Sequence, residues 1–203
     1  GSKVVTRQGI YVSADSIWSL VGTFPTDFIL SVALSGEGSK VAALGDGKVY
    51  TSTNSGATWT SNTPPTGHKV LASSADGTKL VGGGGTLGVV GLMAASVDSG
   101  GIWRLLNLPD NWWHSIASSA DGSKLAAYGH WGGLITSTNS GATWTSANFS
   151  MIGAQAYVVS SADGRRLMAY GWGIFTSSDS GQTWVSNNVP PGFWPSAASS
   201  VDG

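Results

Sequence analysis

Aromatic side chains next to glycines are the clearest candidates for ligand chemistry in this sequence. Two segments, Tyr128-Gly129-His130-Trp131 and Tyr170-Gly171-Trp172-Gly173, place a large ring beside residues that leave open space. Sugar rings stack on such aromatic faces, and short polar groups can satisfy the hydroxyls without any need for charge. We therefore expect a carbohydrate-binding surface formed by Trp131, Trp172, His130, Tyr128 and Tyr170. For the two tryptophans, ligand contact and packing between repeats remain equally open.

Three further tryptophans lie in variable stretches of the sequence. Trp113 and Trp194 each precede the glycine of an Asp-Gly pair by nine residues. This shared position favours filling a gap between repeats slightly over contact with a ligand. Trp112 is expected to be the more exposed member of the Trp112-Trp113 pair, and all three residues are candidates for the same binding surface.

The three histidines offer a second kind of chemistry. His68, His114 and His130 could supply three nitrogen ligands to zinc or another transition metal, as in a metal-dependent hydrolase or lyase. Their spacing matches no local ligand motif, and solvated or hydrogen-bonded loop histidines are the simpler interpretation. We expect no cofactor, and the metal site remains an alternative.

Acid/base chemistry would need a pair of carboxylates. Asp27, Asp46 and Asp110 fall in variable loops and could act on a glycosidic bond at a suitable separation, although turn capping explains Asp46 and Asp110 well. Sialidase chemistry needs an arginine cluster, and the arginines fall elsewhere, at Arg7, Arg104, Arg165 and Arg166. The sequence therefore favours a binding protein over an enzyme.

A repeat of about forty residues must position these candidates. The string TSTNSGATWTS occurs at 51–61 and again at 136–146, with weaker copies elsewhere. The tryptophans that end these copies are separated by 41, 44, 41 and 40 residues and are Trp18, Trp59, Trp103, Trp144 and Trp184. A second motif, SADG or a close variant, recurs in phase at 35–38, 74–77, 119–122, 161–164 and 200–203. Two motifs with one period predict a repeat architecture.

Each repeat contains short stretches of period two separated by turn residues. In the fourth copy we expect strands at 115–118, 124–128, 134–137 and 142–146, with turns at 120–123 and 139–141. Four antiparallel strands per forty residues are typical of a propeller blade. The sequence thus predicts an all-β, five-bladed β-propeller in which residues 1–203 form one closed domain. Because the chain ends in DG and begins with SK after its first residue, we expect N- and C-terminal strands to pair and close the ring.

Antiparallel order divides the loops between two faces. The DG turns join the first two strands of a repeat and the TSTNSGATWTS-like segments join the last two, so both lie on one face. The remaining loops lie on the opposite face and carry all three histidines and the five tryptophans at 112, 113, 131, 172 and 194. Aromatic side chains concentrated on one face indicate a binding surface there.

The pattern Ser-x-Asp-x-Gly-x-Thr-Trp, seen at 177–184, resembles the Asp-box of the BNR repeat family, which includes sialidases and lectin-like propellers. The resemblance implies that the segment is a hairpin in which glycine takes the left-handed conformation and tryptophan packs between blades. It therefore implies structural roles for Trp18, Trp59, Trp103, Trp144 and Trp184. Asn54 and Asn139 replace the aspartate in two copies, and the first copy lacks the glycine.

Composition narrows the class of partner. Charged residues make up 10% of the chain and the net charge is −1, so a nucleic-acid partner is not expected. The absence of cysteine excludes disulfides, and no apolar run is long enough for membrane insertion. Glycans or glycoconjugates are the expected partners, outside the cell or at its surface. A protein-binding platform in a bacterial surface protein is the third alternative.

Overall fold

A computed structural model describes residues 3–6, 9–14, 17–26, 28–64, 68–85, 91–108, 111–131, 133–147, 156–190 and 192–203. At residues 3–6, 12–14, 17, 18, 21 and 68 only the backbone is described. This part of the chain contains nineteen β-strands and no helix, in agreement with the predicted all-β class. None of its segments is therefore a helix suited to crossing a membrane.

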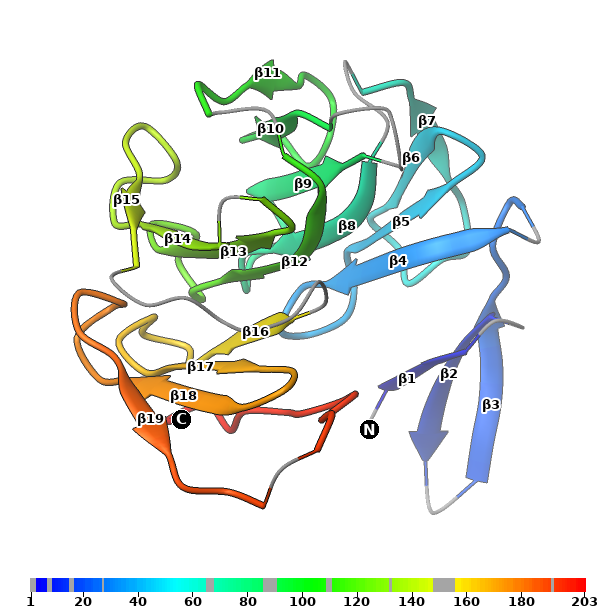
Figure 1. Cartoon of the computed structure of the whole chain (residues 1–203). Helices are drawn as coiled ribbons and strands as arrows, with labels where there is room; N and C mark the ends of the chain where they lie inside the picture. Colours follow the sequence, from blue (N-terminus) through cyan, green and yellow to red (C-terminus); the bar gives the residue numbers. More distant parts are fainter. Residues whose placement is uncertain are drawn as a thin grey trace.

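The strands form five antiparallel sheets arranged about a common centre (Figure 1). The first sheet has three strands, β1 (Lys3–Thr6), β2 (Gly9–Ala14) and β3 (Ile17–Gly22). The second sheet has four, β4 (Ile29–Leu34), β5 (Val41–Gly45), β6 (Lys48–Ser52) and β7 (Thr60–Asn62).

The remaining three sheets repeat this four-stranded order. The third contains β8 (His68–Ser73), β9 (Leu80–Gly84), β10 (Met93–Ser96) and β11 (Arg104–Leu105). The fourth contains β12 (Trp113–Ser118), β13 (Leu125–Gly129), β14 (Gly133–Ser137) and β15 (Thr145–Ser146). The fifth contains β16 (Tyr157–Ser160), β17 (Leu167–Tyr170), β18 (Ile174–Ser177) and β19 (Val185–Asn187). Figure 1 shows β4, β8, β12 and β16 as the strands nearest the centre.

Apolar side chains fill the spaces between neighbouring sheets. One cluster joins Leu71 and Leu80 of the third sheet to Ala33 and Ala42 of the second. Another joins the third and fourth sheets through Met93, Trp113 and Ala127, and a third joins the fourth and fifth through Tyr128, Val158 and Leu167. The second strands are buried along their whole length in the second, third and fourth sheets because both of their faces meet a neighbouring sheet.

The DG turns join the first and second strands and hold themselves together with short polar side chains. In the third sheet, Asp76 Oδ1 accepts hydrogen bonds from Ser74 Oγ at 2.6 Å and from the Thr78 backbone N–H at 2.9 Å. Gly77 closes the turn with a φ of 67°, a conformation that favours glycine. Asp121 and Asp163 make the equivalent bonds to Ser119 and Ser161.

Successive DG turns are hydrogen-bonded to one another. The backbone N–H of Gly36 donates to Ala75 O, that of Ala75 to Ala120 O, and that of Ala120 to Ala162 O, at 2.6, 2.7 and 2.7 Å. The series continues into the C-terminal segment, where the N–H of Ala162 donates to Val201 O at 2.8 Å. Residues 195–203 therefore lie where the first strand and DG turn of another sheet would lie.

We call the hairpins that join the last two strands the Trp hairpins; they span residues 52–59, 96–103, 137–144 and 177–184. Ser137 accepts a hydrogen bond at Oγ from the Gly141 N–H at 2.9 Å, and Asn139 Oδ1 accepts one from the Thr143 N–H at 2.9 Å. Asp179 accepts the equivalent bond from Thr183, so asparagine holds the turn as aspartate does. Serine and glycine are both left-handed here, with φ values of 57° at Ser140 and 84° at Gly141.

Two predicted strand details differ in the structure. The last strand of the fourth repeat was expected at 142–146 and comprises only Thr145–Ser146, because the backbone before it bonds to the Asn139 side chain. The expected closing pair of terminal strands is also not seen: residues 192–203 form no strand, and β1 pairs with β2 alone among the described residues.

A cavity lies between the fifth sheet and the C-terminal segment. It has a volume of about 290 Å³ and is lined by Leu167, Met168, Ser177, Ser199 and Gly203 among others. The corresponding spaces beside the second and third sheets measure only about 10 and 20 Å³, because Ser99 and Ser140 of the next Trp hairpin enter them.

Candidate functional site

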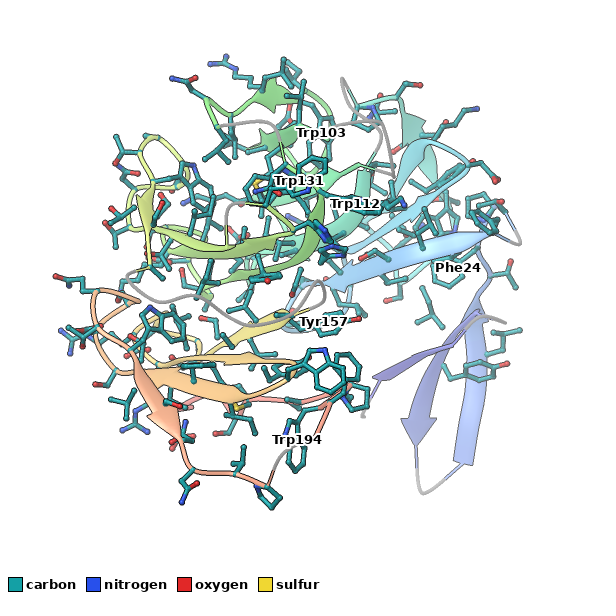
Figure 2. The ribbon with its side chains drawn as sticks, in the orientation of Figure 1. Phe24, Trp103, Trp112, Trp131, Tyr157 and Trp194 are labelled. Carbon is teal, nitrogen blue, oxygen red and sulfur yellow. The ribbon has the colours of Figure 1, made fainter. Side chains whose placement is uncertain are left out.

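The face opposite the Trp hairpins carries a cluster of rings on the fourth sheet. Trp112 precedes β12, and His130 and Trp131 follow β13. The ring of Trp112 lies 5.1 Å from that of His130 and 6.4 Å from that of Trp131, centroid to centroid. His114 completes the group at 5.7 Å from His130. Figure 2 shows the Trp112 and Trp131 side chains close together. We call these four residues the aromatic rim.

Asn111 fixes the backbone on which the aromatic rim stands. Its side chain is 4% exposed, and its Oδ1 accepts hydrogen bonds from the backbone N–H groups of Trp112 at 2.8 Å and Trp131 at 3.0 Å. Gly129 makes room for this amide, because a Cβ there would lie 2.4 Å from the Asn111 Cγ. One buried polar group thus positions two tryptophans that lie nineteen residues apart.

The two rim tryptophans differ in exposure. Trp112 is half-buried, and its Nε1 donates a hydrogen bond of 2.6 Å to Gly85 O in the third sheet. Trp131 is 60% exposed. His130 meets it edge to face, with the ring centroids 5.8 Å apart. The Trp131 ring is therefore supported from one side and open to solvent, which suits stacking against a ligand.

The histidines of the aromatic rim lie in a partly apolar and positively charged setting. Burial lowers the pKa of His114, and the nearby charges of His130 and Lys69 lower it further. Its Nε2 is buried and has no hydrogen-bond partner in the described chain. Tyr128 lies beside His114 with ring centroids 6.5 Å apart, and burial raises the pKa of its phenol.

A second exposed ring belongs to the fifth sheet. Trp172 lies between β17 and β18 and is 61% exposed, and its ring contacts that of Phe193 at a centroid distance of 5.7 Å. Counted from the DG glycine of each repeat, Trp172 corresponds to His130. Phe193 has the same position relative to its DG glycine as Trp112. Phe193 contacts Trp172 of the fifth sheet, and Trp112 bonds to Gly85, which follows β9 of the third sheet, so each ring contacts a loop of the sheet before it. Trp194 binds the same loop through its backbone N–H, which donates to Gly171 O at 2.7 Å.

Two candidate residues lie deeper than the exposed tryptophans. Tyr170 is 7% exposed and stacks on Tyr157 with centroids 5.5 Å apart. Burial raises its pKa, while a hydrogen bond from the backbone of Ala197 acts in the opposite direction. Tyr128 is likewise buried, within the cluster between the fourth and fifth sheets. Both tyrosine rings therefore lie below the surface that carries the exposed tryptophans.

Trp113 and Trp194 carry indole nitrogens that are buried without a hydrogen-bond partner among the described residues. Trp113 is 2% exposed and packs in the cluster of Met93, Ala127 and Ile135. This packing lies between the third and fourth sheets. Trp194 is half-buried near the C-terminal segment (Figure 2).

The candidate metal and acid residues are brought together only in part. His114 and His130 are neighbours, while the side chain of His68, at the start of β8, lies outside the described residues, as do Asp27 and Asp110. Asp46 lies in the turn between β5 and β6, and its carboxylate accepts a hydrogen bond from Thr26 Oγ1. Within the described ranges, no three His, Cys, Asp or Glu side chains are grouped to hold a metal ion.

The tryptophans of the Trp hairpins are half-buried at the opposite face. Trp103, Trp144 and Trp184 each pack against one of the clusters between sheets, and each Nε1 donates to the glycine carbonyl of its own hairpin at 3.0 Å. Trp59 instead donates to Thr23 O at 2.8 Å and contacts Phe24. The side chain of Trp18 is not among those described.

A larger hollow of about 510 Å³ lies on the Trp hairpin side, between the outer strands of the third and fourth sheets. Its lining is mainly apolar and includes Val97, Ile102 and Leu105. Volume alone would favour it as a binding site, but no candidate residue and no aromatic ring lines it. The aromatic rim is the better candidate because exposed rings and polar groups converge there.

Radial four-stranded sheets with short turns on one face and variable loops on the other define a β-propeller fold. No family model matches the sequence, and no curated protein matches it significantly. Several solved structures, however, are similar to this chain in fold. A GH74 enzyme from Niastella koreensis matches with a TM-score of 0.69 and 20% identity, covering 91% of this chain and 29% of its own.

Two other solved structures give the same fold assignment. The GH74 xyloglucanase of Xanthomonas campestris has a TM-score of 0.64 and 18% identity over 81% of this chain and 31% of its own. YCF48 from Cyanidioschyzon merolae has a TM-score of 0.56 and 14% identity over 87% of this chain and 60% of its own. The chain thus spans about three tenths of the GH74 proteins it resembles. At these identities the likeness shows the fold.

Proposed function

We propose that the protein binds carbohydrate through the face opposite the Trp hairpins. The observation that carries the proposal is the exposure of Trp131 and Trp172, at 60% and 61%, on rings that are each supported by a neighbouring ring. A large aromatic surface is costly to leave in water unless a ligand covers it. Flat aromatic rings with few charges suit the apolar faces of sugars.

The structural neighbours give this proposal modest support. GH74 enzymes, one of them named as a xyloglucanase, share the fold over most of this chain. A carbohydrate ligand is consistent with that likeness. Binding rather than hydrolysis is proposed because the only acid described on this face, Asp46, is already bonded to the Thr26 hydroxyl.

A glycan-array screen of the purified chain, with and without EDTA, tests the proposal. We expect binding that survives EDTA and that weakens at least tenfold in Trp131→Ala or Trp172→Ala. Ile102→Ala is a matched control, because Ile102 is 64% exposed on the opposite face. A blank array would overturn the proposal, and loss of binding in EDTA would point to the histidines as metal ligands.

We further propose that residues 1–203 form one closed five-bladed domain of the BNR/Asp-box type. The Trp hairpins and the linked DG turns support this assignment. The cavity of about 290 Å³ beside the C-terminal segment is where β1–β3 would complete the fifth interface. A glycan ligand would place the protein outside the cell or at its surface, and this localisation is part of the proposal.

A further inference from the structure

Lys69 brings a positive charge to the aromatic rim from the neighbouring strand. In β8 the register shifts between His68 and Val70, and in β12 it shifts between Trp113 and Ser115. Lys69 and His114 are therefore equivalent bulge residues. Because β8 and β12 are adjacent, the two side chains start from the same level of neighbouring inner strands. A bulge leaves its extra residue out of the sheet ladder and redirects its side chain.

The charge of Lys69 is not neutralised within the described chain. It forms no ion pair or hydrogen bond there, and its charge adds to burial and to His130 in lowering the pKa of His114. His130 acts on His114 in the same way. The Lys69 ammonium group thus lies near the two imidazoles of the aromatic rim.

Most of the acids among the described residues lie on the other face. In the part of the chain that the structure describes, this face has only Asp46, already bonded to Thr26. The DG turns and Trp hairpins hold the remaining described acids, Glu37, Asp76, Asp98, Asp121, Asp163, Asp179 and Asp202. Lys40, Lys79, Lys124, Arg104, Arg165 and Arg166 accompany those acids on the other face. The charge that favours an anion at the aromatic rim is therefore the local one of Lys69.

Building on the proposed carbohydrate binding, we propose that the aromatic rim recognises an acidic oligosaccharide. One sugar ring stacks on Trp131, and a carboxylate or sulfate group further along the chain lies against Lys69 and His114. His130 separates Trp131 from His114, with centroid distances of 5.8 and 5.7 Å, so a short oligosaccharide rather than a single sugar spans the site. An anionic oxygen also provides a partner for the Nε2 of His114, which has none among the described residues, once that ring turns toward it.

Calorimetric titration of the full chain with tetragalacturonate and with its fully methyl-esterified form tests this inference. The ester keeps the sugar rings and removes the charge. We expect the acid to bind at least tenfold more tightly, and Lys69→Gln to remove most of that difference, because a charged hydrogen bond is lost. Lys69→Arg should retain it. Lys48→Gln is the matched control, since Lys48 is exposed at the same face of the second sheet.

A sulfated galactose tetrasaccharide separates the two sources of anion. Equal binding of sulfate and carboxylate would indicate recognition of charge, and a preference for the carboxylate would indicate recognition of its geometry; either supports the inference. Equal binding of acid and ester, lost in Trp131→Ala, would overturn the acidic class while leaving carbohydrate binding intact. Failure of all three sugars together with a blank array would overturn both.

Discussion

The side-chain oxygen of Asn111 accepts a hydrogen bond from the backbone N–H of Trp131, 3.0 Å away and twenty residues later in the chain. The same oxygen accepts the N–H of Trp112 at 2.8 Å. Because Asn111 is 4% exposed, this tether is shielded from competing water. It connects the start of the inner strand β12 to the loop that carries the most exposed ring of the aromatic rim.

Replacing Asn111 with alanine should therefore affect both stability and binding. Two backbone N–H groups lose their acceptor, which should cost about 2–3 kcal/mol in the free energy of unfolding. Urea denaturation measures that loss, and calorimetry with a sugar identified on the array measures binding. Sugar affinity that is unchanged in the folded variant would show that the tether does not position the rings.

The sequence indicated the repeats and most strands but not this tether. DG turns and Trp hairpins are formed by residues that are close in the sequence, so their residue types and spacing predicted them. Asn111 stands in a polar loop segment, and nothing near it in the sequence indicates a bond to Trp131. Its only signal is Gly129, whose missing side chain makes room for the amide. The bulge that pairs Lys69 with His114 was missed for the same reason, since register between strands is a long-range property.

The DG turns should make stability sensitive to acid. Hydrogen bonds from Ser74 and Thr78 lower the pKa of Asp76 from 3.8 to about 2. Because the folded-state pKa lies below the unfolded one, the carboxylate stabilises the fold above about pH 4, and this contribution is lost as pH falls toward 2. Urea denaturation between pH 5 and pH 2 should show a smaller acid loss in Asp76→Asn. An unchanged pH profile would contradict the prediction.

The serine that begins each Trp hairpin should be more important for stability than its exposed neighbour. Ser137 is 3% exposed and accepts the N–H of buried Gly141 at Oγ. Ser137→Ala leaves that donor unpaired and should cost about 1–3 kcal/mol. Thr138→Ala, at an exposed position of the same hairpin, should cost less than about 0.5 kcal/mol. Similar denaturation midpoints for the two variants would refute this role.

Trp113 should contribute to stability through its ring and not through its nitrogen. Removal of the ring in Trp113→Ala should cost about 3–5 kcal/mol, because it opens a cavity between the third and fourth sheets. In Trp113→Phe the smaller cavity is offset by loss of the unpaired indole N–H, so the net cost should be about 1 kcal/mol or less. Thermal unfolding of both variants compares the contribution of the ring with that of the indole nitrogen. Equal destabilisation would mean that the nitrogen has a partner in solution.

Closure of the ring should be visible in amide exchange. If β1 pairs with the C-terminal segment, the amides of residues 197–200 should exchange slowly, as those of other inner strands do. Deletion of residues 1–23 should accelerate their exchange and reduce thermal stability. Rapid exchange in the full chain would show that the segment has no strand partner.

The series of bonds between DG turns has a consequence for the history of the chain. Each of the three middle turns donates one backbone N–H to the next turn and accepts one bond from the previous turn, through the same residue, which is Ala75, Ala120 or Ala162. A newly duplicated unit inserted anywhere in the series would meet the partners it needs on both sides. Gain or loss of a unit therefore preserves the backbone hydrogen bonds between successive DG turns. Ancestors with a different number of units could have assembled by the same bonds.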